Sequence, residues 1–413
     1  MDILMFLGGV LFSVLFLFLL FVFAVYAVSI FINRKYPDFR PGISVVIPAY
    51  NEEKNIGGCL GAVMASDYPK EKLEVIVVDD GSTDSTAGIV KKYAKVRLLF
   101  QKHKGKSEAL TLGAKAAKHD FVMTLDADTI IDRNCIKALV RPLNDLTIGA
   151  TTGASTVKNR KSLLGVFQNI EYHYNNLIRH SFSKVFNNGI WFFGALACYR
   201  KSALKKVGYF KKDTLTEDMD IALELKQAGC KTINVKEAAG KTLAPETLGE
   251  FYRQRSRWWL GVLQALLKNR ALLSYKSSPS ILFLYLNQFW WSFYALLSLP
   301  LIIYQVSYWL PSNSATLFSL SSYLFRWFTL SGPLYVIYKI PEWGISFYSF
   351  FGVLSGLISS LMIIAALRLY RERAGLRNLF ALFFYFPYTI LLNMIIFISL
   401  LRFRAKKSKF FMK

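Results

Sequence analysis

Long uncharged apolar stretches occupy the two ends of the chain, and short strand-like and helix-like patterns alternate between them. Residues 3–32 contain no charged side chain, and residues 281–306, 345–367 and 378–401 are uncharged as well. Each stretch exceeds the roughly 20 apolar residues that a helix needs to cross a bilayer. Residues 315–338, which carry Arg326, are a fourth C-terminal candidate. The pattern predicts one N-terminal and about four C-terminal membrane helices.

The middle of the chain repeats short apolar runs, each followed by a helical pattern. The runs cover residues 43–48, 73–79, 96–100 and 121–125, and the helix after the first run is expected to begin at Asn51. Strands that alternate with helices favour a mostly parallel sheet that is covered on both faces. The prediction is therefore an α/β fold with a Rossmann-like, mostly parallel sheet, flanked by α-helical transmembrane segments. Ligands of such sheets bind beyond the carboxyl ends of the strands.

Charge and cysteine content narrow the class of protein. The 413 residues carry a formal net charge of +24, and 53% of them are hydrophobic. The basic residues lack the interleaved aromatic groove or recognition helix of a nucleic-acid-binding protein, so we expect no nucleic acid. Lipid headgroups and an anionic substrate are the expected partners. The four cysteines show no paired metal-ligand spacing and suit a reducing cytosol. Arg34 and Lys35 follow the first apolar stretch, and the positive-inside rule places that end in the cytoplasm.

Two carboxylates, Asp126 and Asp128, stand one residue apart where the fourth apolar run ends. Residues i and i+2 of a strand point the same way, so both carboxylates can face one cation. Mg²⁺ and Mn²⁺ prefer such oxygen ligands and commonly share them with substrate phosphates. On its own, an Asp-x-Asp triplet is more often a polar turn that caps a buried strand. Lys106, at a predicted helix start, fits either phosphate neutralisation or a solvated surface position.

Three further side chains follow the ends of predicted strands. If the ligand is a uridine-diphospho sugar, Asp79 or Asp80 can accept the uracil N3–H, and Tyr50 can stack on the ring. Asp126 can then reach the ribose or the metal. Asp-Asp-Gly-Ser is also ordinary turn chemistry, so that alternative stays open.

Five motifs, taken in order, resemble the nucleotide-sugar half of the family 2 inverting glycosyltransferases over roughly residues 43–265. They are Val46-Ile-Pro-Ala-Tyr-Asn-Glu52, Val78-Asp-Asp-Gly-Ser-Thr-Asp84, Leu125-Asp-Ala-Asp128, Thr216-Glu217-Asp218 and Gln254-Arg-Ser-Arg257-Trp258. The last resembles the Gln-x-x-Arg-Trp signature of the processive membrane members, which include the cellulose, chitin, hyaluronan and poly-N-acetylglucosamine synthases. Gly194-Ala-Leu-Ala-Cys-Tyr-Arg200 resembles the acceptor-side strand of the family. Pro245-Glu-Thr-Leu248 is closest to the poly-N-acetylglucosamine synthase type.

The resemblance implies transfer of sugar from a UDP-sugar to the growing end of a β-linked polysaccharide, with inversion and help in translocation. It implies that Asp218 is the general base and that Mg or Mn binds at Asp126 and Asp128. The implied nucleotide-sugar-binding residues are Ala49, Tyr50, Glu52, Asp79, Asp80, Lys106, Asp126, Gln254 and Arg257. The implied acceptor-binding residues are Gly194, Glu217 and Trp258, whose indole would form a platform under the acceptor sugar.

The resemblance and the apolar pattern together divide an integral protein of the cell membrane into five parts. They are a transmembrane helix at 1–35, a cytoplasmic glycosyltransferase domain at 36–245, interfacial helices at 246–278, transmembrane helices at 279–403 and a basic cytoplasmic tail at 404–413. Residues 163–186 are expected to form another interfacial helix.

Basic residues at 368–377 and in the tail both favour the cytoplasm, and one crossing between them cannot satisfy both. We expect four crossings, with the cluster at 368–377 outside or at an interface. The alternative is that the segment of Arg326 is re-entrant and that Pro387 breaks the last span.

Two other functions remain open. A non-processive enzyme would transfer one sugar to a polyprenyl phosphate and use its helices as an anchor, but such enzymes generally lack Gln-x-x-Arg-Trp. A channel or assembly subunit with a degenerate nucleotide-binding domain would not need intact Asp126, Asp128, Asp218 and Trp258. The sequence indicates neither the sugar nor the oligomeric state.

Overall fold

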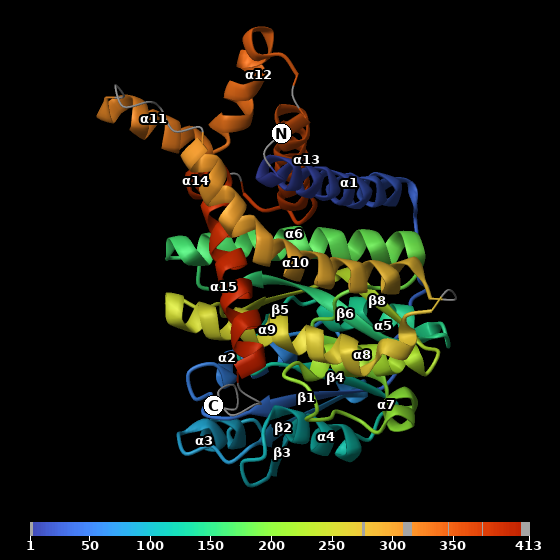
Figure 1. The fold of residues 1–413 in the computed structure, drawn as a ribbon. Helices are drawn as coiled ribbons and strands as arrows, with labels where there is room; N and C mark the ends of the chain where they lie inside the picture. Colours follow the sequence, from blue (N-terminus) through green and yellow to red (C-terminus); the bar gives the residue numbers. More distant parts are fainter. Residues whose placement is uncertain (1–2, 275–276, 309–315, 346, 374, 406–413) are drawn as a thin grey trace.

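The computed structural model describes residues 3–274, 277–308, 316–345, 347–373 and 375–405. Within them, eight strands form one mixed sheet in the order β3-β2-β1-β4-β7-β6-β8-β5 (Figure 1). The strands are β1 (Ile43–Ala49), β2 (Leu73–Asp79), β3 (Val96–Phe100), β4 (Phe121–Leu125), β5 (Ile130–Ile131), β6 (Ile148–Val157), β7 (Leu196–Arg200) and β8 (Lys231–Thr242). The four strands expected from the sequence pair in parallel. β7 then pairs antiparallel with both β4 and β6, so the sheet is mixed beyond β4.

Helices cover both faces of this sheet, as the alternating pattern predicts. Side chains alternate along a strand, so Val45 joins the buried cluster that contains Leu60 of α2, and Val46 joins the cluster that contains Leu110 of α4. The helices of this part are α2 (Ile56–Met64), α3 (Thr86–Lys91), α4 (Lys106–Ala116), α5 (Cys135–Val140), α7 (Lys201–Val207) and α8 (Glu217–Gln227).

The chain after β1 departs from the sequence expectation, because α2 begins at Ile56 and not at Asn51. Asn51 has a positive φ of 55°, which no right-handed helix contains. Its side-chain oxygen accepts a hydrogen bond from the Thr83 backbone N–H at 2.9 Å, and its own N–H donates to the Ser82 hydroxyl at 3.0 Å. These polar bonds between two loops outweigh the local helical tendency and fix the segment after Tyr50.

Two long helices lie between the sheet and the apolar helices. α6 (Leu163–Phe186) contacts β6 and β8 on one side and α1 (Ile3–Phe31) and α13 (Phe347–Leu369) on the other. α9 (Leu248–Lys268) packs against α8 and α15 (Tyr385–Ala405). Figure 1 shows α6 above the sheet, with α1 beyond it. Both sides of α6 are therefore covered by protein, and many of its polar side chains are buried.

Within the described residues, four helices are long and apolar enough to cross a membrane, which is the make-up of an integral membrane protein. Their apolar spans are Phe6–Phe31, Pro279–Ile303 of α10 (Pro279–Tyr308), Phe350–Leu369 and Tyr385–Phe403.

The candidate span at 315–338 is not one helix. It is divided into α11 (Leu317–Trp327) and α12 (Ser331–Trp343). Pro333 lies in the first turn of α12, where a proline is tolerated because its missing N–H would have no partner in the helix. The last span is divided in the same way into α14 (Leu376–Phe383) and α15, with Pro387 in the first turn of α15. The break beside Pro387 is the one that the alternative topology named above expects, and the re-entrant path of the Arg326 segment stays a prediction.

The basic cluster at 368–377 lies against the sheet-bearing part of the molecule. Glu372 binds Arg160 at 2.6 Å and the ring of His173 at 3.1 Å, and the Arg377 guanidinium donates to the Lys161 carbonyl at 2.8 Å. Arg160 and Lys161 belong to the connection between β6 and α6. These contacts place the cluster on the same side as the sheet, so it is not separated from the sheet by the width of a membrane. Its place at a membrane interface stays a prediction.

Candidate active site

The paired carboxylates lie side by side at the end of β4. The backbone N–H of Asp126 donates to the Ala195 carbonyl at 3.1 Å, which fixes the turn. One oxygen of Asp128 accepts hydrogen bonds from the hydroxyls of Thr129, at 3.1 Å, and Thr242, at 3.2 Å. Burial and the neighbouring charge of Asp126 raise the pKa of Asp128. Two carboxylates that repel each other in a half-buried place favour a bound cation.

The donor set fits a magnesium or manganese ion that keeps some of its ligands from water and substrate. Among the described residues, no group of three or more His, Cys, Asp or Glu side chains could hold a metal ion. Mg²⁺ is usually bound through one or two carboxylates plus substrate phosphates. Asp126 and Asp128 supply that number of carboxylates, and both line the same cavity.

Lys106 lies at the start of α4 and joins the carboxylates of two different elements. Its ammonium is 2.6 Å from an oxygen of Asp126 and 3.2 Å from an oxygen of Glu217. Burial alone would lower the pKa of Lys106, but these two carboxylates outweigh it and raise the pKa. Lys106 is therefore paired, and the expectation of a purely solvated position at the helix start is not met.

Glu217 and Asp218 occupy the first turn of α8. The Gly194 backbone N–H donates to one oxygen of Asp218 at 2.9 Å. Burial, followed by the charge of Glu217, raises the pKa of Asp218 to about 6. Burial would raise the pKa of Glu217 too, but Lys106 and Arg257 outweigh it and lower that pKa. The two adjacent carboxyls thus differ in proton affinity, and Asp218 is the better proton acceptor.

Gly194 lets the segment that leads into β7 approach α8 closely. A β-carbon at this position would lie 2.3 Å from the Asp218 β-carbon, which is shorter than any real contact between carbon atoms. Glycine is therefore the residue that allows the hydrogen bond between the Gly194 N–H and the Asp218 carboxylate.

The Gln-x-x-Arg-Trp residues come from α9, whose start is fixed by a capping box between Thr247 and Glu250. Arg257 donates to the Leu215 carbonyl at 3.4 Å, next to the first turn of α8. The Gln254 side-chain oxygen is buried and has no hydrogen-bond partner among the described residues. The Trp258 indole is half-buried against Tyr172, with ring centroids 6.3 Å apart. All three side chains line the cavity that the carboxylates line.

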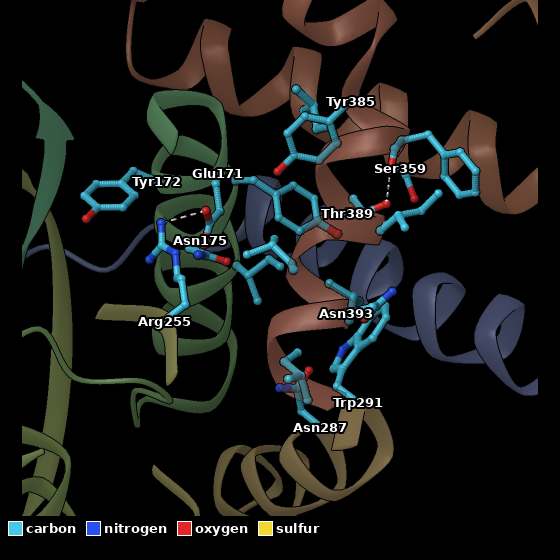
Figure 2. Close-up of a pocket in the computed structure, with 18 of the residues that line it drawn as sticks. Glu171, Tyr172, Asn175, Arg255, Asn287, Trp291, Ser359, Tyr385, Thr389 and Asn393 are labelled. Atoms are coloured by element: carbon cyan, nitrogen blue, oxygen red, sulfur yellow. Dashed lines mark hydrogen bonds and ion pairs between the residues drawn. The ribbon is translucent and has the colours of Figure 1, made fainter. Parts of the chain in front are cut away.

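One cavity of about 1240 Å³ joins these residues to the apolar helices. At its polar end lie Lys106, Asp126, Asp128, Glu217, Asp218, Gln254, Arg257 and Trp258. Figure 2 shows its other part, where uncharged polar and aromatic side chains of α6, α10, α13 and α15 surround the space. They include Asn175, Asn287, Trp291, Ser359, Tyr385, Thr389 and Asn393.

Six of the predicted site residues are not among the described residues that line this cavity. They are Ala49, Tyr50, Glu52, Asp79, Asp80 and Gly194. Gly194 acts through Asp218, as described above. Ala49 ends β1, and its carbonyl accepts the Asp80 N–H at 2.9 Å. Glu52 accepts a hydrogen bond from the Asn55 side chain at 2.8 Å, and burial raises its pKa.

The other three surround the turn after β2. Asp79 accepts the Ser82 N–H at 2.8 Å. Asp80 accepts the N–H groups of Lys104 and Gly105, both at 2.8 Å, and so shapes the loop that leads to Lys106. Tyr50 is 45% exposed and stacks on His103, with ring centroids 4.2 Å apart. One face of the Tyr50 ring is thus covered by the imidazole, and the binding of uracil here remains a prediction.

Three side chains in the site were missed from the sequence. Thr242, at the end of β8, donates to Asp128, and no local pattern indicates it. Glu171 and Arg255 form an ion pair of 2.8 Å in the cavity wall. The sequence does contain a sign of this pair. Glu171 is the one charged residue among residues 163–172, and Arg255 lies inside the Gln-x-x-Arg-Trp motif.

Comparisons with known proteins show which family the chain resembles. The sequence model of the family described as glycosyltransferase like family 2 matches residues 41–261. The poly-beta-1,6-N-acetyl-D-glucosamine synthase of Staphylococcus aureus (strain COL) is 34% identical over 252 residues, which are 58% of this chain and 59% of the relative. That of Staphylococcus epidermidis is 33% identical over 238 residues, which are 55% and 56% of the two chains. The chain thus spans about three fifths of the length of the curated relatives it matches.

A solved structure shares the fold. It is a mannosyltransferase from Pyrobaculum calidifontis in complex with GDP-Man and Mn²⁺, with a TM-score of 0.60 and 21% sequence identity. The likeness covers 89% of this chain and 98% of that one. The resemblance in fold therefore extends beyond the sheet to most of the chain.

Proposed function

Because the chain belongs to glycosyltransferase like family 2, we propose that it transfers a sugar from a UDP-sugar to the growing end of a β-linked polysaccharide, with inversion at the anomeric carbon. The observation that carries this proposal is the continuity of the cavity from Asp128 and Asp218 to the polar side chains of α10, α13 and α15. A polymerase needs such a path for its product, whereas a transferase that modifies one lipid needs only an anchor. The names of the relatives favour N-acetylglucosamine as the sugar.

The diphosphate of the donor would be held at the end of β4. Asp126 and Asp128 would bind Mg²⁺ or Mn²⁺, and the ion would neutralise the charge of the departing diphosphate. Lys106 and Arg257 line the same part of the cavity and add two fixed positive charges. Gln254 offers a buried amide whose oxygen has no partner among the described residues. These groups bind and orient the donor so that its anomeric carbon faces Asp218.

The transfer step needs one base. Asp218 takes the proton from the acceptor hydroxyl, while an oxygen lone pair of that hydroxyl forms the new bond to the anomeric carbon. The bond between that carbon and the diphosphate oxygen breaks on the opposite face, and the configuration is inverted. A pKa near 6 leaves most of Asp218 ionised at neutral pH, which is near the optimum for a general base. The Gly194 N–H holds one carboxylate oxygen, and so orients the side chain.

The acceptor would lie between Trp258 and Glu217, which both line the cavity. The apolar face of a pyranose packs well on an indole ring, and Glu217 can accept a hydrogen bond from a sugar hydroxyl. After each transfer the lengthened polymer would advance into the part of the cavity between the apolar helices.

We infer that the catalytic domain faces the cytoplasm. Arg34, which follows α1, donates to the Lys184 carbonyl at 2.5 Å. The basic end of α1 therefore lies beside the sheet-bearing part, and basic ends of membrane helices face the cytoplasm. UDP-sugars supplied from the cytoplasm would then enter directly.

The test is a panel of donors with the purified full chain. UDP-N-acetylglucosamine, UDP-glucose, UDP-glucuronic acid and GDP-mannose would each be supplied with Mg²⁺ or Mn²⁺, and the products would be read by mass spectrometry. We expect a ladder of β-linked N-acetylglucosamine oligomers, and no ladder from the Asp218→Asn variant. A single sugar added to a polyprenyl phosphate would show the non-processive alternative to be correct. No turnover of any donor would favour a channel or assembly role.

A further inference from the structure

A buried ion pair joins three helices that are far apart in the sequence. The Arg255 guanidinium of α9 is 2.8 Å from a carboxylate oxygen of Glu171 in α6. The same oxygen accepts a hydrogen bond from the Tyr388 hydroxyl of α15. Arg255 is 6% exposed and Tyr388 is 3% exposed. Figure 2 shows Arg255 and Glu171 pointing toward each other at the wall of the cavity.

A pair of this kind needs a reason other than stability. The free energy needed to remove two charges from water is about as large as the free energy of their attraction. Apolar residues of similar size therefore often stabilise a fold equally well. Arg255 gains only part of its hydrogen bonds here, because its Nε and Nη1 atoms are buried and have no partner among the described residues. The guanidinium is thus paired with one carboxylate, and its other N–H groups make no hydrogen bond to the described residues. A different kind of contact must therefore hold the rest of the group.

That contact is with aromatic rings. The Arg255 guanidinium carbon lies 4.5 Å from the ring centroid of Trp258, 4.9 Å from that of Phe251 and 5.8 Å from that of Tyr172. A guanidinium is attracted to the faces of such rings, most strongly to that of tryptophan. Trp258 also packs against Tyr172, the chain neighbour of Glu171. The indole thus contacts Arg255, and Arg255 in turn is paired with Glu171.

We propose that Glu171 and Tyr388 position the Arg255 guanidinium against the Trp258 indole, and that this contact sets the orientation of the ring on which the acceptor sugar lies. The three are positioning residues for the acceptor, and none of them is needed to bind the donor. The inference rests on the proposed function, because it assumes that Trp258 receives the acceptor. Since Tyr388 belongs to α15, it also ties the acceptor platform to a helix that lines the path of the product.

The experiment compares the use of donor and acceptor by single variants of the full chain. Arg255→Lys keeps the charge opposite Glu171 but loses the planar group that stacks on Trp258. Tyr388→Phe removes only a hydroxyl and keeps the ring, which stacks on Phe167 with centroids 5.2 Å apart. Arg253→Lys is the matched control, because Arg253 is exposed on the same helix.

Each protein would be assayed with UDP-N-acetylglucosamine and a pentasaccharide of β-linked N-acetylglucosamine as the acceptor. We expect the acceptor KM to rise about tenfold in Arg255→Lys and about threefold in Tyr388→Phe, in line with the loss of one ring contact or one hydrogen bond. The affinity for UDP with Mn²⁺, measured by calorimetry, should stay within about twofold of wild type, and Arg253→Lys should change neither quantity.

Several results would overturn the inference. An unchanged acceptor KM in both variants would do so, and so would a parallel loss of UDP affinity, which would mean that the cluster only holds the helices together. If Arg255→Lys does not fold, the result for Tyr388→Phe decides. A different result would show that the proposed function itself is wrong. The wild-type protein would then bind UDP but would not extend the pentasaccharide.

Discussion

Replacement of Lys106 by methionine should strengthen the binding of a divalent ion in the absence of nucleotide. The Lys106 ammonium lies 2.6 Å from Asp126, and Asp126 is one of the two proposed metal ligands. A divalent ion and this ammonium therefore compete for the same carboxylate oxygen. Methionine removes the competing charge and keeps much of the length of the side chain.

The magnitude follows from the distance and the exposure of the pair. Two unit charges about 4 Å apart attract by about 1 kcal/mol in water and by about 4 kcal/mol near a protein surface. The side chains of Lys106 and Asp126 are 39% and 29% exposed, so water screens the pair and the lower part of this range applies. A change of about 1–2 kcal/mol corresponds to a factor of about 5–30 in affinity. Lys106→Met should bind Mn²⁺ alone about 5–30-fold more tightly than wild type.

The assay is a titration of the purified protein with Mn²⁺ at neutral pH, followed by electron paramagnetic resonance of the free ion. Lys102→Met is the matched control, because Lys102 is exposed in the loop that leads to Lys106, and it should leave the Mn²⁺ affinity unchanged. The affinity for UDP with Mn²⁺ should fall in Lys106→Met, because the ammonium also serves the diphosphate. Unchanged or weaker binding of Mn²⁺ alone by Lys106→Met would refute the competition between ion and lysine.

Three further outcomes follow from the site and its surroundings. Because burial and Glu217 raise the pKa of Asp218 to about 6, the transfer rate should fall about tenfold per pH unit below pH 6, and a pH–rate profile with its acid limb near pH 4 would contradict the role of Asp218. Gly194→Ala places a β-carbon 2.3 Å from that of Asp218 and should reduce the single-turnover rate about a hundredfold, with a full rate counting against the close approach. The hydrogen bond from His173 and the charge of Arg160 lower the pKa of Glu372 to about 2. This stabilisation is present above the unfolded pKa of about 4.3 and is lost as pH falls toward 2, so Glu372→Gln should lower the free energy of unfolding at pH 7 by about 1–3 kcal/mol, as measured by denaturant titration.

The hydrophobic pattern of the sequence predicts the position of those site residues that lie at the ends of strands and the starts of helices. Asp126 and Asp128 follow β4, so their place at the edge of the sheet follows from the carboxyl-end rule for parallel strands. Asp218 lies in the first turn of α8, a helix whose start the sequence pattern predicts. Lys106 and Trp258 join them in one cavity. The elements that carry these residues could be predicted from the sequence because each has a clear local pattern, whereas the roles of Asp218 and Trp258 come from the family resemblance and stay proposals.

Other features depend on contacts between distant segments and leave little trace in local pattern. β7 inserts antiparallel beside β4, and no alternation of strand and helix signals that reversal. The ion pair between Glu171 and Arg255 joins residues 84 positions apart. Asp80 accepts the backbone N–H groups of the loop that leads into α4, and the sequence around it does not indicate these bonds; its contact with a nucleotide stays a prediction. Contacts of this kind can be assigned only from the three-dimensional structure.

The measurement that tests the central claim most directly separates two carboxylates that look alike in sequence. Asp128→Ala and Asp218→Asn would each be compared with wild type by calorimetric UDP affinity with Mn²⁺ and by single-turnover sugar transfer. Asp128→Ala should lose nucleotide affinity and turnover together, because Asp128 is proposed to hold the metal. Asp218→Asn keeps the size of the side chain but cannot take a proton, so it should bind UDP nearly as well as wild type and lose about 10² or more in rate. Near-normal turnover by Asp218→Asn, or a loss of UDP affinity as large as that of Asp128→Ala, would contradict the account.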